Sequence, residues 1–448
     1  MRVAYFSPLP PAASGIADYS AELLPHLGRH TDVTLFVDPA LPLDDALAGE
    51  FPVRDMASFG LRREEFDVAL YHMGNDAAYH EHVYRVMQET PGVVVLHETN
   101  FYHFFREFTV ARDDPGAFLR VLESVYGRAD AEHALMQFDA WHRNRYAFPS
   151  LSPLLANALG AIVHSQYARR QVQRRRPDLA AAIIPHHLSL PAPFDSGVDR
   201  EAIRRDLGLA GRFAVGSFGF VTEAKRPAVL LRAFAHLHRR HPESVCCLVG
   251  QVSPAVDLAG LVTEAGLPES AVRITGRVPL DKFLHYMIAT DVAVNLRYPT
   301  SGETSGSVIR LLGLGVPTIV SDVGAFAELP DDACARVPVD AWEEDTLVAI
   351  LEALAADGEL RRAMGANARR HVRAYHTLEG SAQAYATFLE RVVAGEAAPV
   401  GPPATLPEAE VMSDIGATLA GWDITEYDDV VLHPIAQVMA EIGLFVSR

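Results

Sequence analysis

The sequence predicts an α/β protein made of two doubly wound domains with parallel sheets. Short apolar runs, typical of strands buried on both faces, alternate with helical segments from the amino terminus to residue 393. This alternation is interrupted once, at a Pro- and Ser-rich stretch (186–197) with the composition of a hinge. Polar, glycine-bearing loops follow several strands, at the sheet edge where ligands bind in open α/β folds.

The first domain is expected to cover residues 1–190. An opening strand runs into a Pro-rich loop ending at Ser14-Gly15, and a helix follows from about 16 to 27. The region 101–150 combines many aromatic and charged residues with weak strand signal, so we expect a helical insertion there. The strands expected in this domain are 2–6, 32–37, 68–71, 92–96, 161–163 and 183–185.

The second domain is expected to cover residues 198–393, and a linker with an acidic tail (394–448) follows it. Apolar positions along the tail favour packing back onto the first domain, and a homodimer contact is the alternative. The expected strands are 213–218, 245–249, 272–275, 291–296 and 318–320, and the expected helices are 227–239, 256–265, 281–289, 308–314, 343–356, 359–375 and 378–393.

The composition excludes several classes of protein. A formal net charge of −18 argues against general nucleic-acid binding and against adhesion to anionic membranes. Three cysteines cannot form a disulfide framework, and we expect buried thiols. The start MRVAYFSP is a strand rather than a signal peptide, and no apolar run has the length of a membrane span, so a cytoplasmic location is expected. None of the 19 histidines has metal-site spacing, so no metal is expected.

The stretch 295–322 carries the most specific pattern, a strand, a glycine-rich loop, a helix and a second strand. Gly302 and Gly306 let the backbone approach a ligand, and the start of the helix presents free N–H groups. Glu303 stands among these donors. A carboxylate repels phosphate, so we expect it to accept hydrogen bonds from hydroxyls of the same ligand; a helix-capping acid is the alternative. Phosphate and hydroxyls on one ligand indicate a sugar nucleotide.

Three further candidates follow strands. Gly15 closes the first strand–loop–helix, where either a tight turn or an approaching phosphate or sugar explains it. Lys225 and Arg226 precede a helix start, where adjacent cations favour a bound anion over a solvated surface pair. His97 ends a parallel strand, and its imidazole can donate to a substrate oxygen. The lower-ranked histidines are His164, His186 and His187.

To about residue 393 the chain resembles glycosyltransferases of the GT-B fold, specifically the retaining group called family 4 (glycosyl transferases group 1). The resemblance implies two Rossmann-like domains that face each other across a cleft, the first binding the acceptor and the second the nucleotide-sugar donor. The matching elements are the loop ending at Ser14-Gly15, the strand ending at His97-Glu98, the Lys225 loop, and SGETSGS with the helix and GVPTIVSD that follow.

The resemblance also implies roles for individual residues. Lys225 would bind the donor diphosphate, Glu303 the hydroxyls of the donor sugar, and His97 the sugar near the reaction centre. The Gly15 loop would pack on phosphate or sugar, and the backbone around Arg277 would meet the nucleotide base. The other donor-binding candidates are Arg226, Val278, Gly302, Thr304, Ser305, Gly306 and Ser307.

Two positions depart from the family pattern. The second glutamate of its E-x7-E motif, which holds the ribose, is Leu311 here, and Phe220 stands where an arginine is common. These departures leave the donor's identity open.

The expected function is metal-independent transfer of a sugar, with retention, from a UDP- or GDP-linked donor to a hydroxyl-bearing acceptor: a glycan, lipid-linked, small-molecule or protein acceptor. No cofactor is expected. The alternatives are a non-catalytic nucleotide-sugar or glycan binder and a GT-B epimerase. A phosphorylase is disfavoured, because the chain has no motif for an inorganic phosphate site or a cofactor lysine.

Overall fold

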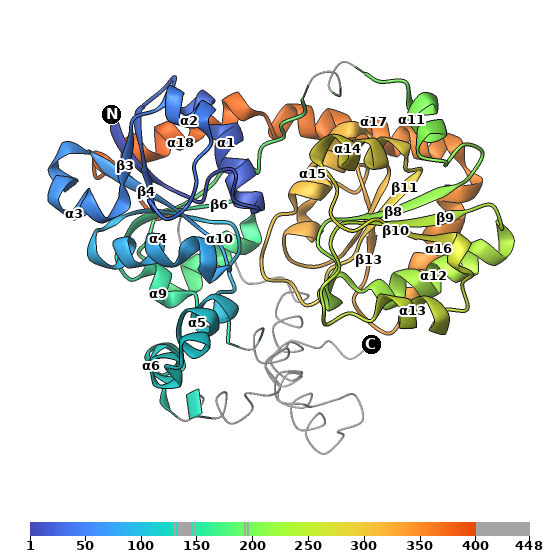
Figure 1. The fold of residues 1–448 in the computed structure, drawn as a ribbon, viewed down its shortest axis with the longest axis horizontal. Helices are drawn as coiled ribbons and strands as arrows, with labels where there is room; N and C mark the ends of the chain where they lie inside the picture. The colour runs from blue at the N-terminus through green and yellow to red at the C-terminus, as the bar shows by residue number, and fades with distance from the viewer. Residues whose placement is uncertain (129–130, 133–145, 147, 192–193, 195–196, 400–448) are drawn as a thin grey trace. The chain divides into compact units, whose positions relative to one another are not determined.

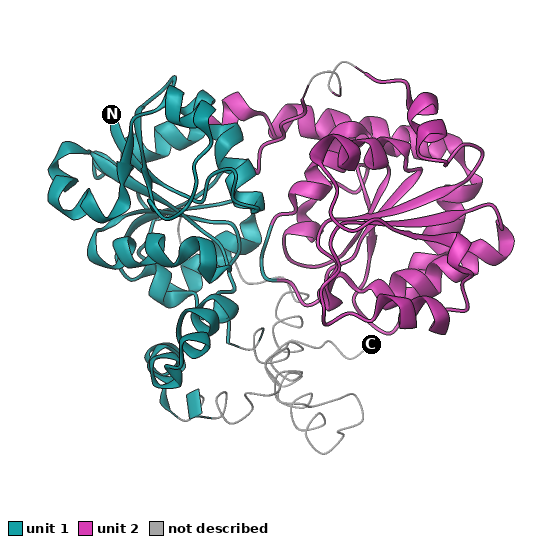
Figure 2. Cartoon of the chain, viewed as in Figure 1, with its two compact units in different colours: residues 1–184, 301–303, 384–448 teal, residues 185–300, 304–383 magenta. Residues whose placement is uncertain are grey.

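The computed structural model describes residues 1–128, 131–132, 146, 148–191, 194 and 197–399 (Figure 1). The chain divides into two compact units (Figure 2). Unit 1 comprises residues 1–184, 301–303 and 384–448, and unit 2 comprises 185–300 and 304–383. The predicted tail, 400–448, lies outside the described residues, as does most of 129–147.

Unit 1 contains a parallel seven-stranded sheet in the order β3-β2-β1-β4-β5-β6-β7. All residues of β4 and β5 are buried, as expected for central strands covered on both faces. The strands are β1 (Arg2–Phe6), β2 (Asp32–Val37), β3 (Val53–Asp55), β4 (Val68–Met73), β5 (Gly92–Leu96), β6 (Ala158–Val163) and β7 (Ala181–Ile183).

The helices of unit 1 begin with side-chain caps where the sequence provides them. Ser14 caps α1 and Ser165 caps α10, the latter accepting from the Ala168 N–H at 3.1 Å, as predicted for Ser165. The elements are α1 (Gly15–Leu27), α2 (Asp45–Glu50), η1 (Met56–Ser58), α3 (Phe59–Arg62), η2 (Arg63–Glu65), α4 (Ala77–Glu89), α5 (Tyr102–Thr109), η3 (Val110–Arg112), α6 (Pro115–Tyr126), α9 (Ser152–Leu155) and α10 (Gln166–Arg175).

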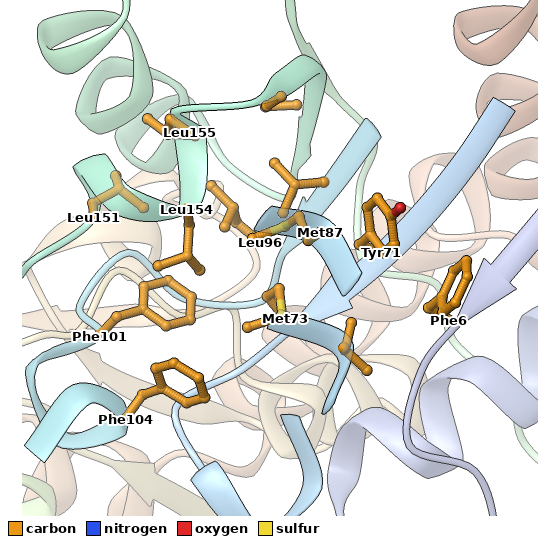
Figure 3. Packing of buried hydrophobic residues seen from close by; sticks show 14 of the residues in the cluster. Phe6, Tyr71, Met73, Met87, Leu96, Phe101, Phe104, Leu151, Leu154 and Leu155 are labelled. Carbon is orange, nitrogen blue, oxygen red and sulfur yellow. The ribbon is translucent and has the colours of Figure 1, made fainter. Parts of the chain in front are cut away.

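The main hydrophobic core of unit 1 packs one face of this sheet against α4, α5, α6 and α9. Figure 3 shows part of this core, with strand residues such as Met73 and Leu96 beside Phe101 and Phe104 from the region 101–150. Phe101 and Phe104 are fully buried there. The described part of the predicted insertion is therefore helical and contributes to the core.

Unit 2 contains a parallel six-stranded sheet in the order β10-β9-β8-β11-β12-β13. Its strands are β8 (Ala214–Phe218), β9 (Val245–Val249), β10 (Val272–Ile274), β11 (Val292–Asn295), β12 (Thr318–Ser321) and β13 (Ala335–Val337). Its helices are α11 (Arg200–Asp206), η5 (Glu223–Lys225), α12 (Pro227–Arg240), α13 (Leu258–Glu264), η6 (Glu269–Ala271), α14 (Leu280–Ala289), α15 (Gly306–Leu314), η7 (Gly324–Glu328), α16 (Glu343–Ala356) and α17 (Gly358–Tyr375).

Alternate residues of these strands point to opposite faces, as the period of a strand requires. Val292 and Val294 pack with α12, α13 and α16, whereas Ala293 packs with α14. Helix α18 (Leu378–Val393) begins in unit 2, and its residues from 384 onward belong to unit 1. By residue contacts the change from unit 2 to unit 1 falls between residues 383 and 384, inside this helix, ten residues before the domain end expected at 393.

Most predicted strands and helices are confirmed within a few residues, and the differences have physical reasons. Strand β3, which the sequence analysis omitted, is a three-residue edge strand without an apolar run. Strand β7 ends at Ile183, two residues before the predicted end at Pro185, which has no N–H for a sheet hydrogen bond. No helix among the described residues is both long and apolar enough to span a membrane.

Candidate functional site

The candidate site residues lie at the carboxyl edges of the two parallel sheets. Gly15 follows β1 and His97 follows β5 in unit 1, while Lys225 follows β8 and Arg277 follows β10 in unit 2. The loop 296–305 connects β11 with α15. Because all strands of a parallel sheet end at the same edge, each set gathers at one edge of its own unit.

Lys225 is buried, with 9% of its surface exposed, and its ammonium donates to the Phe218 carbonyl. A Cβ built on Gly219 would lie 2.9 Å from Lys225 Nζ and 3.4 Å from Ser307 Oγ. The two side chains therefore converge on the bare backbone of Gly219. Lys225 and Lys282 are the two lysines among the 39 basic residues of the chain, a scarcity that the sequence analysis did not use.

The amino terminus of α15 lies beside this lysine. Ser305 is its N-cap and accepts from the Val308 N–H at 3.3 Å, and Gly306 and Ser307 form the first turn. The first N–H groups of a helix have no partners within it and carry partial positive charge. An ammonium, a hydroxyl and a helix amino terminus thus surround one point, which is the chemistry of an anion site.

Arg226 has a different environment from the one predicted. Its guanidinium pairs with the carboxylate of Glu343, whose side chain is only 4% exposed, and lies 6.0 Å from the centroid of the Tyr298 ring. The backbone of Arg226 is in the left-handed region (φ 54°, ψ 46°), and the Tyr298 N–H donates to the Ala224 carbonyl at 2.8 Å. Arg226 therefore joins the Lys225 loop to α16 and to the loop after β11, and its charge is matched within the protein.

The segment around Gly276 follows β10 and presents mainly backbone. Gly276 is in the left-handed region (φ 66°) and pairs with Gly250, while a Cβ on Gly250 would lie 2.2 Å from the Gly219 carbonyl oxygen. The side chain of Val278 packs partly buried against the core beneath. The base contact that the resemblance implies would fall to the backbone of this segment.

Gly302 and Glu303 belong to unit 1 by their residue contacts, and Thr304 to Ser307 belong to unit 2. Gly302 has a φ of 76°, a conformation that favours glycine. The Glu303 carboxylate accepts from the Ser301 N–H at 2.8 Å, so it also stabilises the turn that presents it. Leu311, in place of the second glutamate, is 1% exposed in the core of unit 2. An ionised carboxylate would be costly there.

In unit 1, His97 belongs to a cluster of rings. Its Nε2 lies 3.1 Å from Nδ1 of His72, a fully buried residue of β4. The ring of Tyr19 packs edge-on at 4.8 Å between centroids, and the ring of His164 lies at 5.1 Å. Since one of two bonded imidazole nitrogens must donate, the tautomer of His97 is linked to that of His72.

Two tyrosines border this cluster. The hydroxyls of Tyr19 and Tyr385 are 2.9 Å apart, and burial raises the pKa of both phenols, so both remain neutral at physiological pH. His164 Nδ1 lies 2.8 Å from the Ile184 carbonyl, which only accepts, so Nδ1 carries a proton. Gly15 opens α1 with open space around its α-carbon.

Two residues near these edges, His72 and Asn295, were missed by the sequence analysis, whereas Thr304 was among its donor-binding candidates. His72 was hidden within a strand, although a histidine in an otherwise apolar run is itself a signal. Asn295 ends β11, is 2% exposed, and has no partner for either polar side-chain atom among the described residues. The hydroxyl of Thr304 is likewise buried without a partner in that part of the chain. Buried polar atoms of this kind are normally satisfied by water or a ligand.

Within the described ranges, no three or more His, Cys, Asp or Glu side chains are grouped to hold a metal ion.

The two sheet edges can now be compared with known proteins. Residues 199–371 match the family model described as Glycosyl transferases group 1. The matched range contains Lys225, Ser307 and the whole of α15. It also contains Glu303, and it ends before α18.

Curated relatives match over a similar length. A D-inositol 3-phosphate glycosyltransferase from Corynebacterium kroppenstedtii is 28% identical over 204 residues, which are 42% of this chain and 44% of the relative. A lipopolysaccharide core biosynthesis mannosyltransferase, LpcC from Rhizobium leguminosarum bv. viciae, is 32% identical over 183 residues, 40% of this chain and 50% of the relative. The chain therefore spans about half the length of these relatives.

Solved structures match over most of the chain. HepE from Anabaena in complex with UDP aligns with a TM-score of 0.61 at 17% identity, covering 87% of this chain and 99% of that one. Sucrose-phosphate synthase from Thermosynechococcus elongatus aligns with a TM-score of 0.62 at 18% identity, covering 88% and 100%. At this identity the likeness concerns the fold, and the GT-B fold with two Rossmann-like domains is confirmed.

Proposed function

We propose that the protein is a glycosyltransferase that moves a sugar from a nucleotide-sugar donor to a hydroxyl-bearing acceptor, with retention and without a metal ion. The observation that carries the proposal is the convergence of Lys225 Nζ and Ser307 Oγ on Gly219 at the amino terminus of α15. The site lies inside the range that matches group 1 glycosyl transferases. HepE, which shares the fold, was crystallised with UDP and with UDP-glucose.

In this proposal the carboxyl edge of the sheet in unit 2, where Lys225 and the start of α15 lie, stabilises the leaving group. When the bond from the sugar to the diphosphate breaks, negative charge grows on the β-phosphate oxygens. The ammonium of Lys225 and the free N–H groups of α15 are fixed before the reaction, so they stabilise this charge without reorganising. Removing one such preorganised donor typically costs about 3 kcal/mol of transition-state stabilisation. These protein groups supply the positive charge that a metal ion supplies elsewhere.

The donor sugar needs orientation rather than deprotonation. We assign this role to Glu303, whose carboxylate accepts from its own turn at 2.8 Å and, as an ionised acid, can accept several hydrogen bonds at once. The β-phosphate itself accepts the acceptor's proton in this mechanism. His97 contacts the sugar near the reacting carbon, with its ring oriented by His72 at 3.1 Å. UDP- and GDP-sugars are the donors proposed, and the acceptor binds mainly to unit 1.

Asn295 adds a polar group at the same edge of unit 2. Its side chain is 2% exposed and lacks a protein partner among the described residues. It ends β11, directly before the loop that leads to α15. We assign it to hydrogen bonding with a water molecule or with the donor phosphate, because either ligand would remove the cost of leaving it unsatisfied.

The proposal is tested with a panel of nucleotide sugars, by measuring released UDP or GDP for the wild type and for Lys225→Ala. We expect the variant to lose about 100-fold in kcat, which corresponds to the ~3 kcal/mol above. Lys282→Ala is the matched control, because Lys282 is exposed on α14. Unchanged turnover in Lys225→Ala would overturn the leaving-group role. Glu303→Gln should lose transfer and keep nucleoside diphosphate binding.

A non-catalytic nucleotide-sugar binder is the second candidate, favoured by the burial of Leu311 at the position of the missing glutamate. Because the chain has two lysines, labelling the lysine ε-carbon with ¹³C yields two NMR signals, one for Lys225 and one for Lys282. A binder would show a UDP- or GDP-dependent shift of the Lys225 signal and no release from any donor. An epimerase would instead convert the donor sugar without needing an acceptor.

A further inference from the structure

A cavity of about 570 Å³ lies at the other edge of the sheet in unit 2. Its lining includes Asp291, which directly precedes β11, and Pro317, which directly precedes β12. Since Lys225 follows β8 in the same parallel sheet, the cavity and the Lys225 site are at opposite ends of the strands. Helices α11, α14, α15 and α17 contribute the walls and lie along one side of the sheet in Figure 1.

The lining is strongly basic in a protein that is otherwise acidic. Arg200, Arg361, Arg362 and Arg369 line the cavity, and Asp291 is the one acid among the described residues of its lining. Asp291 is already satisfied, because it accepts from Arg200 at 2.7 Å, from Arg204 at 3.1 Å and from the Ala214 N–H at 2.8 Å. The remaining guanidiniums therefore produce a local positive potential against a net charge of −18.

Helix capping explains part of this arrangement. Arg361 donates to the Leu354 and Ala355 carbonyls at the end of α16, and Arg369 donates to the Leu314 carbonyl at the end of α15. Arg200 donates to the Ile288 carbonyl, near the end of α14, at 2.9 Å. A helix carboxyl terminus carries only about −0.5 charge, so three of them offset less than half of four guanidiniums. Arg200 donates to three carbonyls and to Asp291, whereas the capping bonds of Arg361 and Arg369 occupy the minority of the five N–H donors of each of these two guanidiniums.

The arginines of α17 are held in place by a close helix contact. A Cβ on Gly365 would lie 2.1 Å from the Gly315 carbonyl oxygen, so α17 approaches the turn after α15 as closely as backbones allow. Arg361 is further held 5.3 Å over the ring of Phe213. Guanidiniums fixed before binding lose little side-chain entropy when an anion arrives. Ile288, Leu314 and Val316 supply an apolar wall beside them.

We propose that this cavity binds the phosphate ester of a small molecule, with the phosphoryl group on Arg361, Arg362 and Arg369 and the uncharged body against the apolar wall. Arginine suits this role because its planar fork matches phosphate oxygens in pairs. The volume falls within the range of small-molecule pockets and exceeds the needs of a bare ion. The site does not depend on the proposed glycosyl transfer. Helix α15, nine residues long, begins at the Lys225 edge and ends at this cavity.

The test is thermal unfolding of the full chain with inorganic phosphate or glycerol 3-phosphate, at an ionic strength held constant with NaCl. We expect a saturable rise of about 1–2 °C in the wild type at tenfold excess over Kd. The rise should disappear in Arg369→Gln and persist in Arg370→Gln, a matched control on α17 outside the cavity lining. It should also persist in Lys225→Ala. Glycerol 3-phosphate should bind at least fivefold more tightly than inorganic phosphate.

Three results would overturn the proposal. One is the absence of any saturable rise in the wild type. Another is a rise that Lys225→Ala abolishes and Arg369→Gln keeps, because the anion would then occupy the Lys225 site. The third is equal affinity for the ester and the bare ion, which would remove the role of the apolar wall. If Arg369→Gln does not fold, Arg362→Gln replaces it, since within the described part of the chain Arg362 pairs with the exposed Glu359, at 3.5 Å.

Discussion

The pairing of Arg226 with Glu343 leads to a prediction that can be checked without knowing any substrate. Arg226 occupies a left-handed conformation that costs a residue with a side chain about 1–2 kcal/mol, and glycine avoids that cost. The position is therefore unfavourable for arginine unless its side chain contributes. Its guanidinium is 34% exposed and the Glu343 carboxylate 4% exposed, so the pair is largely buried.

The magnitude follows from this burial. Removing one partner of a fully buried pair costs about 3–5 kcal/mol. Because a third of the guanidinium surface is exposed, we expect Glu343→Gln to cost about 2–3 kcal/mol. Arg226→Ala loses the pair and keeps the strain, whereas Arg226→Gly loses both. Arg226→Gly should therefore be the more stable of the two by about 1 kcal/mol.

The assay is a double-mutant cycle measured by calorimetry of the full chain. The coupling energy between Arg226 and Glu343 should be about 2 kcal/mol. Arg232 and Glu344 provide the matched control, because they join the same two helices at 2.7 Å with side chains 49% and 32% exposed. Their coupling should be below about 1 kcal/mol. Equal coupling in the two cycles, or an Arg226→Gly variant no more stable than Arg226→Ala, would refute the reasoning.

Three further outcomes are expected. Gly365→Ala should lower the free energy of unfolding by about 3 kcal/mol or more, because its Cβ would lie 2.1 Å from a backbone oxygen. Gly49→Ala, with open space around it, should raise that free energy by about 0.5–1 kcal/mol, and urea unfolding compares the two variants. Burial lowers the pKa of His376 to about 4, below the ~6.5 of the unfolded chain, so the unfolded state binds more protons between these values and the free energy of unfolding decreases as the pH falls. Between pH 7 and 5 His376 should account for a loss of about 2 kcal/mol, and His376→Gln should remove that share while the loss from His80, whose pKa is also lowered to about 4, remains. Burial raises the pKa of Cys247 to about 11 and that of Cys334 to about 12, and it raises the pKa of Cys246 as well. At pH 8 a thiol reagent should therefore modify none of the three cysteines until urea is added. Rapid modification of the native chain would contradict their burial.

Much of the fold was predictable from local pattern. The strands at 32–37 and 92–96 and the helices at 343–356 and 378–393 have the predicted bounds, because buried parallel strands and amphipathic helices leave periodic signals. Elements without such signals were missed, such as β3, which is short and lies at the sheet edge. The residues at the ends of strands were also predictable as site candidates, because a parallel sheet gathers them at one edge.

What the side chains do at that edge depended on contacts distant in sequence. Sequence reasoning expected a bound anion at both Lys225 and Arg226, yet the structure directs Lys225 to the point shared by Gly219 and Ser307 and pairs Arg226 with Glu343. His72 looked like one more strand residue until the register of β4 and β5 placed it against His97. The chain by itself determined which segments form strands, helices and polar loops, since those choices depend on neighbours a few residues away. Only the tertiary structure decided which charges are matched and which remain to meet a ligand, because pairing is set by residues that folding brings together from more than a hundred positions apart.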